Sequence, residues 1–337
     1  MAIFIKIIYF ILVFSAIVFV HEFGHFIVAK MYKIEVEQFM LGFGPKLIKF
    51  KKGETLYSFR AIPLGGAVML AGETGESDSP NTFKSKARWK QFTVMLAGPF
   101  MNFVFAILLL FAVYSFSGQP SNLVTYLNDN SPAMKAGIIL GDRIVKFDDT
   151  KISNWNDIVE FIKNSKGEKI SVTVKRDNKL ISNIVVTPEK NIKEDRFIIG
   201  VSSNEKSISM AAVSTKNTFV FMSTSIVKFI PKLFSDKKML KELSGPIGIA
   251  NVVGKASDAG IMSILVLTAF ISINLGVMNL LPIVPLDGGK MFILLIEMCI
   301  RRKLSEKVEN LISYSGLALM LFLFVMVMYN DIAKMFV

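Results

Sequence analysis

The sequence predicts a polytopic α-helical membrane protein with four transmembrane helices, a small membrane-associated β element and one separate α+β domain. Of the 337 residues, 52% are hydrophobic, and the mean hydropathy is +0.49, which together exceed the values of an ordinary soluble domain. Four apolar stretches are long enough to cross a bilayer, namely residues 2–29, 92–116, 261–282 and 311–329. These stretches are the four predicted spans.

The first span ends in His21-Glu22-Phe23-Gly24-His25. Positions i and i+4 share one face of a helix, so His21 and His25 can bind one zinc ion with Glu22 beside it. Chance occurrence and ordinary buried histidines are the alternative explanation. However, the chain has only these two histidines, and burying three such groups at membrane depth is costly without a partner. The span is too long for a cleavable signal peptide.

In the second span, Gly98-Pro99 and Asn102 interrupt the apolar run. A kink or a close packing contact explains the first two. Asn102 is a polar candidate for the interior of the helix bundle.

Charge predicts the topology of the chain. The net charge is +12, but no basic run alternates with aromatic residues on one face, so we expect no nucleic-acid partner. Lysines and arginines gather in residues 30–91 and 301–307, which makes both loops cytoplasmic by the positive-inside rule. Both termini and the segment between the second and third spans are then extracytoplasmic.

Residues 34–70 read as short β-strands at 34–40, 46–50, 55–60 and 67–70, separated by glycine- and proline-containing turns. One reading is a solvated hairpin. The other is a sheet edge that folds back toward the histidines and pairs with an extended substrate. Gly42, Phe43 and Gly44 are the candidate substrate-binding residues of this element.

Residues 119–203 form the clearly soluble segment. Its run Ala136-Gly137 to Gly141-Asp142-Arg143-Ile144 resembles PDZ domains of the bacterial type, which implies a module able to hold peptide ends or strands. Residues 207–238 are apolar but contain several lysines, and we expect them to lie on the membrane surface as an amphipathic stretch rather than to form a fifth span. Residues 244–248 are then a turn-rich link into the third span, so residues 204–258 form an amphipathic surface segment and linker. The predicted parts are therefore residues 1–118, 119–203, 204–258 and 259–337.

The third span ends in a stretch that runs from Asn274 to Asp287-Gly288-Gly289. Catalytic zinc needs three protein ligands and an open position, and the histidines supply two. Asp287 is the best third ligand because the predicted topology puts it at the cytoplasmic depth of the histidines. A turn or capping role is its alternative. Asn279 and Asn274 either bind substrate or hold helices together.

The combination of His21-Glu22-Phe23-Gly24-His25, Gly42-Phe43-Gly44, a PDZ-like insert and Asn279 to Gly289 resembles the site-2 protease family, and within it the bacterial RseP and RasP type. The resemblance implies an intramembrane Zn²⁺ metalloprotease in which His21, His25 and Asp287 hold the metal and Glu22 is the base. It also implies that residues 42–45 belong to a re-entrant β element. Some members have two PDZ domains, whereas this chain has room for one.

The implied function is hydrolysis of transmembrane segments in single-pass proteins already trimmed outside, such as anti-sigma factors and remnant signal peptides. The implied location is the bacterial inner (cytoplasmic) membrane, with the PDZ-like domain extracytoplasmic and the active site toward the cytoplasm. The expected partners are these substrates, the lipid bilayer and peptide ends at the PDZ-like domain. An alternative is a zinc-stapled scaffold or chaperone, although a structural zinc site usually has a fourth Cys or His.

Overall fold

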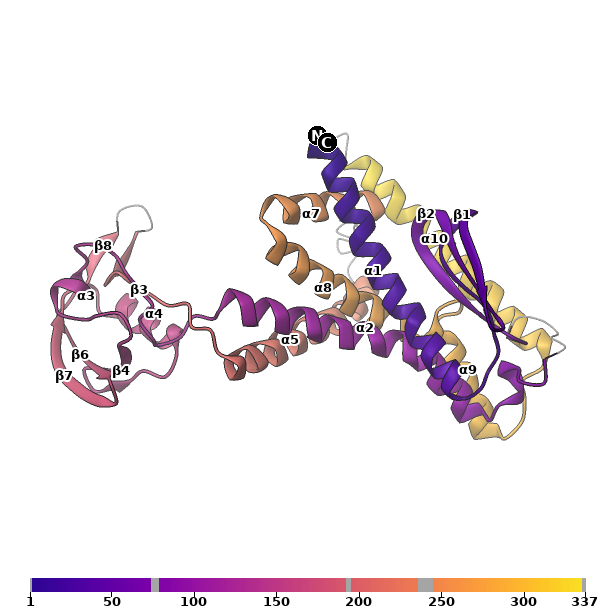
Figure 1. The fold of residues 1–337 in the computed structure, drawn as a ribbon, viewed down its shortest axis with the longest axis horizontal. Helices are drawn as coiled ribbons and strands as arrows, with labels where there is room; N and C mark the ends of the chain where they lie inside the picture. Colours follow the sequence, from indigo (N-terminus) through magenta and orange to yellow (C-terminus); the bar gives the residue numbers. More distant parts are fainter. Residues whose placement is uncertain (1, 74–78, 192–194, 236–244, 335–337) are drawn as a thin grey trace. The chain divides into compact units, whose positions relative to one another are not determined.

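The computed structural model describes residues 2–73, 79–191, 195–235 and 245–334 (Figure 1). The chain divides into two compact units, one formed by residues 1–110 and 216–337 and the other by residues 111–215. The predicted soluble segment 119–203 lies within the second unit. Its predicted limits, and those of the other parts, remain predictions.

Within the described residues, four helices are long and apolar enough to cross a membrane, in agreement with the prediction. They are α1 (Ala2–Met31), α2 (Arg88–Ser117), α8 (Ile261–Asn279) and α10 (Glu306–Ala333). Helix α8 ends at Asn279 rather than at residue 282. The next residues form tight turns, with Leu280 and Leu281 donating to the carbonyls of Val277 and Met278.

Three further helices are α5 (Ile208–Ser235), α7 (Pro246–Asp258) and α9 (Asp287–Ile300). Helix α5 is not among the four candidate spans; residues 236–244 of the predicted surface segment lie outside the described residues. The expected turn-rich link at residues 244–248 is wrong beyond Gly245, because α7 begins at Pro246. Asp331 of α10 accepts hydrogen bonds from the amides of Gly245, Ile247 and Gly248 at 2.9–3.1 Å, which satisfies the free donors of a helix start.

The β element consists of two long antiparallel strands, β1 (Val36–Lys52) and β2 (Thr55–Leu70). Both bend at glycines with positive φ, including Gly42 and Gly65 at 85°. Phe39 therefore pairs with both Tyr57 and Val68. Segment 36–41 lies between segments 55–60 and 66–70, so residues 66–70 form an edge of the sheet. The four predicted short strands are present as parts of β1 and β2.

Both strands of the β element pack against α1, β2 more extensively than β1. A buried apolar cluster joins the end of α1 to the strands, α2 and α9; its members include Ala29, Val36, Leu70, Val94 and Met291. Gly24 allows α1 and α2 to approach closely, because a Cβ atom there would lie 2.4 Å from the carbonyl oxygen of Ala97. These contacts fix the end of α1 that carries the two histidines.

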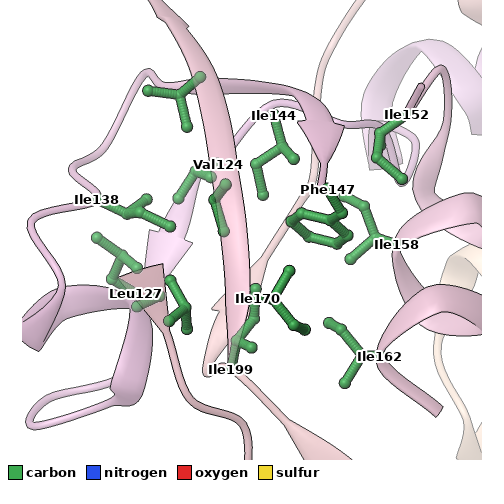
Figure 2. Packing of buried hydrophobic residues seen from close by; sticks show 14 residues of the cluster. Val124, Leu127, Ile138, Ile144, Phe147, Ile152, Ile158, Ile162, Ile170 and Ile199 are labelled. Atoms are coloured by element: carbon green, nitrogen blue, oxygen red, sulfur yellow. The ribbon is translucent and has the colours of Figure 1, made fainter. Parts of the chain in front are cut away.

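The second unit has its own hydrophobic core, seen in Figure 2. Alternate residues of β6, namely Ile170, Val172 and Val174, are buried, as expected for a strand with one face on a core. The regular elements are β3 (Tyr126–Leu127), α3 (Pro132–Lys135), β4 (Arg143–Phe147), β5 (Thr150–Lys151), α4 (Trp155–Asn164), β6 (Ile170–Arg176), β7 (Lys179–Val186), β8 (Glu189–Asn191), β9 (Arg196–Ile198) and β10 (Val201–Ser202).

Two carboxylates of the second unit have structural roles. Asp142, from the Gly-Asp run, is fully buried and pairs with Arg176 at 2.7 Å. Asp157 forms the capping box of α4 with Asn154. The amide of Ser153, which donates to Asp157 at 2.7 Å, is the main cause that lowers the pKa of that carboxyl. The sheet order β5-β4-β6-β7 gives the α+β unit that the sequence predicts.

Candidate metal centre

Two imidazoles lie together in the C-terminal half of α1. His21 and His25 are one helical turn apart, and their Nε2 atoms are 3.3 Å from each other. Both residues are buried, with 7% of their surface exposed. Because the two Nε2 atoms converge, α1 by itself offers two of the three protein ligands that a catalytic zinc ion needs.

Asp287 is the first residue of α9 and brings a carboxylate to the same place. Its Oδ2 atom lies 3.1 Å from Nε2 of His21 and 3.3 Å from Nε2 of His25. In the part of the chain that the structure describes, this is the one group of three such side chains whose ligand atoms lie within 4.8 Å of one another. We call His21, His25 and Asp287 the metal centre.

Atom spacing in the metal centre fits a zinc ion. With bonds of about 2.0–2.1 Å, the ligands of a tetrahedral zinc site are about 3.3 Å apart, and the three separations here are 3.1, 3.3 and 3.3 Å. Oδ2 of Asp287 is buried and accepts no hydrogen bond from the described residues. An unpaired buried acceptor costs about 1–3 kcal/mol, and a bound cation would remove that cost.

Gly288 and Gly289 explain how Asp287 reaches the histidines. A Cβ atom on Gly288 would lie 2.3 Å from the carbonyl oxygen of Leu281, and one on Gly289 would lie 2.4 Å from the amide nitrogen of Val284. Only glycine allows the turn after α8 to fold this tightly onto the start of α9. The tight turn places the Asp287 carboxylate against α1.

Helix α2 forms the wall behind the histidines. His25 Nδ1 lies 2.8 Å from the carbonyl oxygen of Val94, and His21 Nδ1 lies 3.2 Å from the side-chain amide of Asn102. Between them, a Cβ atom on Gly98 would lie 2.2 Å from Nε2 of His25. Residues 94, 98 and 102 follow the four-residue spacing of one helix face. This spacing is visible in the sequence. However, the sequence does not show that this face of α2 meets His21 and His25, because that depends on the contact between α1 and α2.

Glu22 lies in the same cavity as the metal centre. The cavity has a volume of about 130 Å³, and its wall also includes Val68 and Lys290. A Cβ atom on Gly66 would lie 3.2 Å from Cγ of Glu22, so β2 passes beside this side chain. The arrangement offers a carboxylate next to two imidazoles and a second carboxylate, the groups that a zinc-dependent hydrolase requires.

Lys290 and Glu73 form an ion pair in the wall of this cavity. Lys290 is one turn after Asp287 on α9, and Glu73 follows the end of β2. The pair connects the edge strand to the helix that carries Asp287. Lys290 carries no distinguishing signal in the sequence, because a lysine near a membrane surface usually indicates only topology.

Asn279 and Asn274 have different positions. Asn279 is buried, and its Nδ2 atom lies 3.4 Å from Nε2 of His21. Asn274 is half-buried on α8 and is not among the described residues that line the cavity. The structure therefore brings Asn279 to the metal centre and leaves Asn274 away from the cavity wall.

The β element reaches the cavity through β2 rather than through residues 42–44. Ala67, Val68 and Leu70 line the cavity, and Gly42, Phe43 and Gly44 are not among its described lining residues. Gly42 is buried, while Phe43 and Gly44 are exposed. A substrate role of residues 42–44 remains a prediction, and residues 66–70 are the strand segment next to Glu22.

Comparison with known families gives one match that covers nearly the whole chain. The family model of peptidase family M50 matches residues 9–323. Two relatives named as zinc metalloproteases are similar over their full length. One, from Clostridium acetobutylicum, is 35% identical over 98% of this chain and 98% of its own, and one from Fusobacterium nucleatum is 37% identical over 95% and 96%.

The regulator of sigma-W protease RasP of Bacillus subtilis is 30% identical, over 97% of this chain and 98% of its own length. Among solved structures, the PDZ domain of an SdrC-like protein from Listeria monocytogenes is similar to a quarter of this chain. The match covers 25% of this chain and 86% of that one, with 19% identity and a TM-score of 0.22.

Proposed function

Because this chain belongs to peptidase family M50, the site-2 protease family, and is a membrane zinc metalloprotease, we propose that it cuts peptide bonds in or near the transmembrane segments of single-pass proteins. The observation that carries the proposal is the meeting of His21, His25 and Asp287 with Glu22 in one cavity between apolar helices. The finer claim concerns the substrate, which we take to be a protein already trimmed outside the membrane.

Each polar group of the cavity then has a role. His21, His25 and Asp287 hold the zinc ion, which when bound supplies a Lewis acid that lowers the pKa of water toward neutrality. Glu22 accepts a proton from the attacking water and donates it to the leaving amide nitrogen. Asn279, beside His21, donates a hydrogen bond to the substrate carbonyl oxygen as negative charge develops on it.

The substrate must unwind before it is cut, because a membrane helix keeps its carbonyl groups in hydrogen bonds. Residues 66–70 form an edge of the sheet beside Glu22. An extended peptide can pair with such an edge through its main chain. Gly42, Phe43 and Gly44 contribute indirectly in this arrangement, by bending β1 so that segment 36–41 supports the edge.

The proposed location is the bacterial cytoplasmic membrane, with both termini and residues 119–203 outside and the metal centre toward the cytoplasm. The charge distribution supports this orientation. The substrate class includes anti-sigma factors and remnant signal peptides. The name of the RasP relative, a regulator of sigma-W protease, supports the former.

The first test is metal-dependent cleavage of a purified single-pass substrate in liposomes. We expect 1,10-phenanthroline to reduce cleavage to background and added zinc to restore it, because zinc supplies the Lewis acid. The non-chelating isomer 1,7-phenanthroline is the control and should leave the rate unchanged. If the protein binds one zinc ion per chain but cleaves none of the trimmed substrates, the scaffold or chaperone alternative replaces the protease.

A second test concerns substrate selection by residues 119–203, the predicted PDZ-like domain. Gln119 and Glu205 pair through two backbone hydrogen bonds of 2.8 Å, so a short Gly-Ser linker can replace residues 120–203. If this domain excludes untrimmed proteins, the shortened enzyme should cleave full-length and trimmed substrates at similar rates. Cleavage of the trimmed substrate reports that the shortened enzyme is active. Unchanged preference for the trimmed substrate would contradict the filter.

A further inference from the structure

We infer that the side-chain oxygen of Asn102 accepts a hydrogen bond from Nδ1 of His21 and so holds that imidazole in the tautomer that zinc requires. Asn102 is then a positioning residue of the metal centre, acting on the metal through His21. The inference rests on the proposed function, because it assumes that His21 binds zinc.

Asn102 lies directly behind His21. It is fully buried on α2, and the Nδ2 atom of its side-chain amide lies 3.2 Å from Nδ1 of His21. Its backbone carbonyl oxygen accepts a hydrogen bond of 2.9 Å from the hydroxyl of Ser272 on α8. The backbone of Asn102 is therefore held between two helices, and its side-chain amide points toward the imidazole.

The tautomer of His21 follows from the direction of its two nitrogens. Nε2 faces Asp287 and His25, so it is the nitrogen that would bind the metal. A metal-binding nitrogen carries no proton, and the proton of the neutral ring must then be on Nδ1. A donor on Nδ1 needs an acceptor, and of the two ends of the Asn102 amide only the oxygen can accept.

Rotation of the amide by a half turn exchanges its oxygen and nitrogen and puts the oxygen at Nδ1. Within the described residues, Oδ1 of Asn102 has no hydrogen-bond partner, so no existing bond of that oxygen opposes the rotation. With the nitrogen toward Nδ1 instead, the imidazole proton would be on Nε2, where it would block the metal. Zinc binding and the amide orientation are thus coupled.

His25 provides an internal comparison. Its Nδ1 lies 2.8 Å from the carbonyl oxygen of Val94, and a backbone carbonyl can only accept. His25 is therefore held in the metal-binding tautomer by the main chain, while His21 depends on a side chain that can be replaced. The absence of a side chain at Gly98 allows α2 close enough to serve both rings.

The test compares three variants of the full-length protein. Loss of a hydrogen-bond partner of a zinc-binding histidine typically lowers metal affinity by about 10–100-fold, and we expect this loss for Asn102→Leu, which keeps the size of the side chain. Asn102→Asp keeps an acceptor at this position and should therefore avoid this loss of affinity. Thr268→Val is the control, because the buried Thr268 hydroxyl bonds within its own helix.

Zinc affinity is measured by competition with a chelator, and the tautomers by ¹⁵N NMR of histidine-labelled protein in lipid. The chain has two histidines, so four ring nitrogens give the signal. In zinc-loaded wild type we expect both Nδ1 atoms to carry a proton. In Asn102→Leu, the chemical shift of His21 Nδ1 should change to that of an N–H group without a hydrogen bond. The chemical shifts of His25 should stay unchanged.

Three results would overturn the inference. They are His21 binding zinc through Nδ1, Asn102→Leu binding zinc as tightly as wild type, and Asn102→Asp losing as much affinity as Asn102→Leu while still folded. If Asn102→Leu does not fold, the wild-type spectrum and Asn102→Asp carry the test. A wild-type protein that binds no zinc overturns the proposed function itself, which separates the two failures.

Discussion

Glu22→Gln should slow cleavage by roughly two orders of magnitude or more and leave the zinc content unchanged. Glutamine has the size of glutamate and can still form hydrogen bonds. However, its amide cannot take a proton from water at neutral pH. Loss of a general base typically lowers the rate about 10²–10⁴-fold. We expect kcat on a trimmed single-pass substrate to be reduced by about 10²–10⁴-fold. Mass spectrometry should still find one zinc ion per chain.

The control for Glu22→Gln is Glu37→Gln, the same substitution at an exposed position of β1. Glu37→Gln should cleave at the wild-type rate. A Glu22→Gln variant that cleaves as fast as wild type would refute the assignment of the base. A variant that loses its zinc would instead place Glu22 among the groups that hold the metal.

Asp287→Ala should remove zinc from the protein. The carboxylate provides the only oxygen among the three candidate ligand atoms, and without it the two imidazoles remain with no third protein ligand. We expect the fall in zinc affinity to exceed the roughly 100-fold upper range for loss of an outer hydrogen-bond partner, and cleavage to fall to background. Zinc content after dialysis against a buffered zinc solution measures the effect.

The matched control for Asp287→Ala is Asp258→Ala, which removes a carboxylate that pairs with Lys6. This variant should keep one zinc ion per chain. If Asp287→Ala also keeps its zinc with wild-type affinity, Asp287 has only the turn role that its place before two glycines allows. A folding control is needed for both variants, and thermal unfolding in detergent serves this purpose.

The charges in the cavity lead us to expect that a bound metal stabilises the fold as well as supporting activity. Glu22 and Asp287 bring two carboxylates to a cavity inside an apolar helix bundle, where an unpaired charge is costly. Lys290 pairs with Glu73 and so offsets little of this negative charge. A divalent cation bound between the imidazoles and Asp287 would compensate this negative charge directly.

Local sequence pattern predicted the membrane helices and the two-histidine face well. Apolar length decides whether a helix can span a bilayer, and the spacing of His21 and His25 decides that they share a face. Both properties depend on residues that are neighbours along the chain. The same reasoning missed α7, because its start depends on Asp331, a residue far along the sequence whose carboxylate accepts three of its amide hydrogen bonds.

For the site, the sequence also selected Asp287, from the number of ligands that zinc needs and from the predicted topology. It selected Gly42, Phe43 and Gly44 for substrate contact, whereas residues 66–70 run beside Glu22. Both segments are rich in glycine and flanked by strand-like runs. Which of them faces the cavity depends on how the bent strands pair and pack on α1.

By itself the sequence determined four apolar helices, a pair of histidines on one helix face, a glutamate beside them and an aspartate before two glycines. Only the tertiary structure decided that Val94, Gly98 and Asn102 of α2 stand behind those histidines. The physical reason is that helix periodicity fixes which residues share a face, while the partner of that face is set by close packing between helices far apart in sequence.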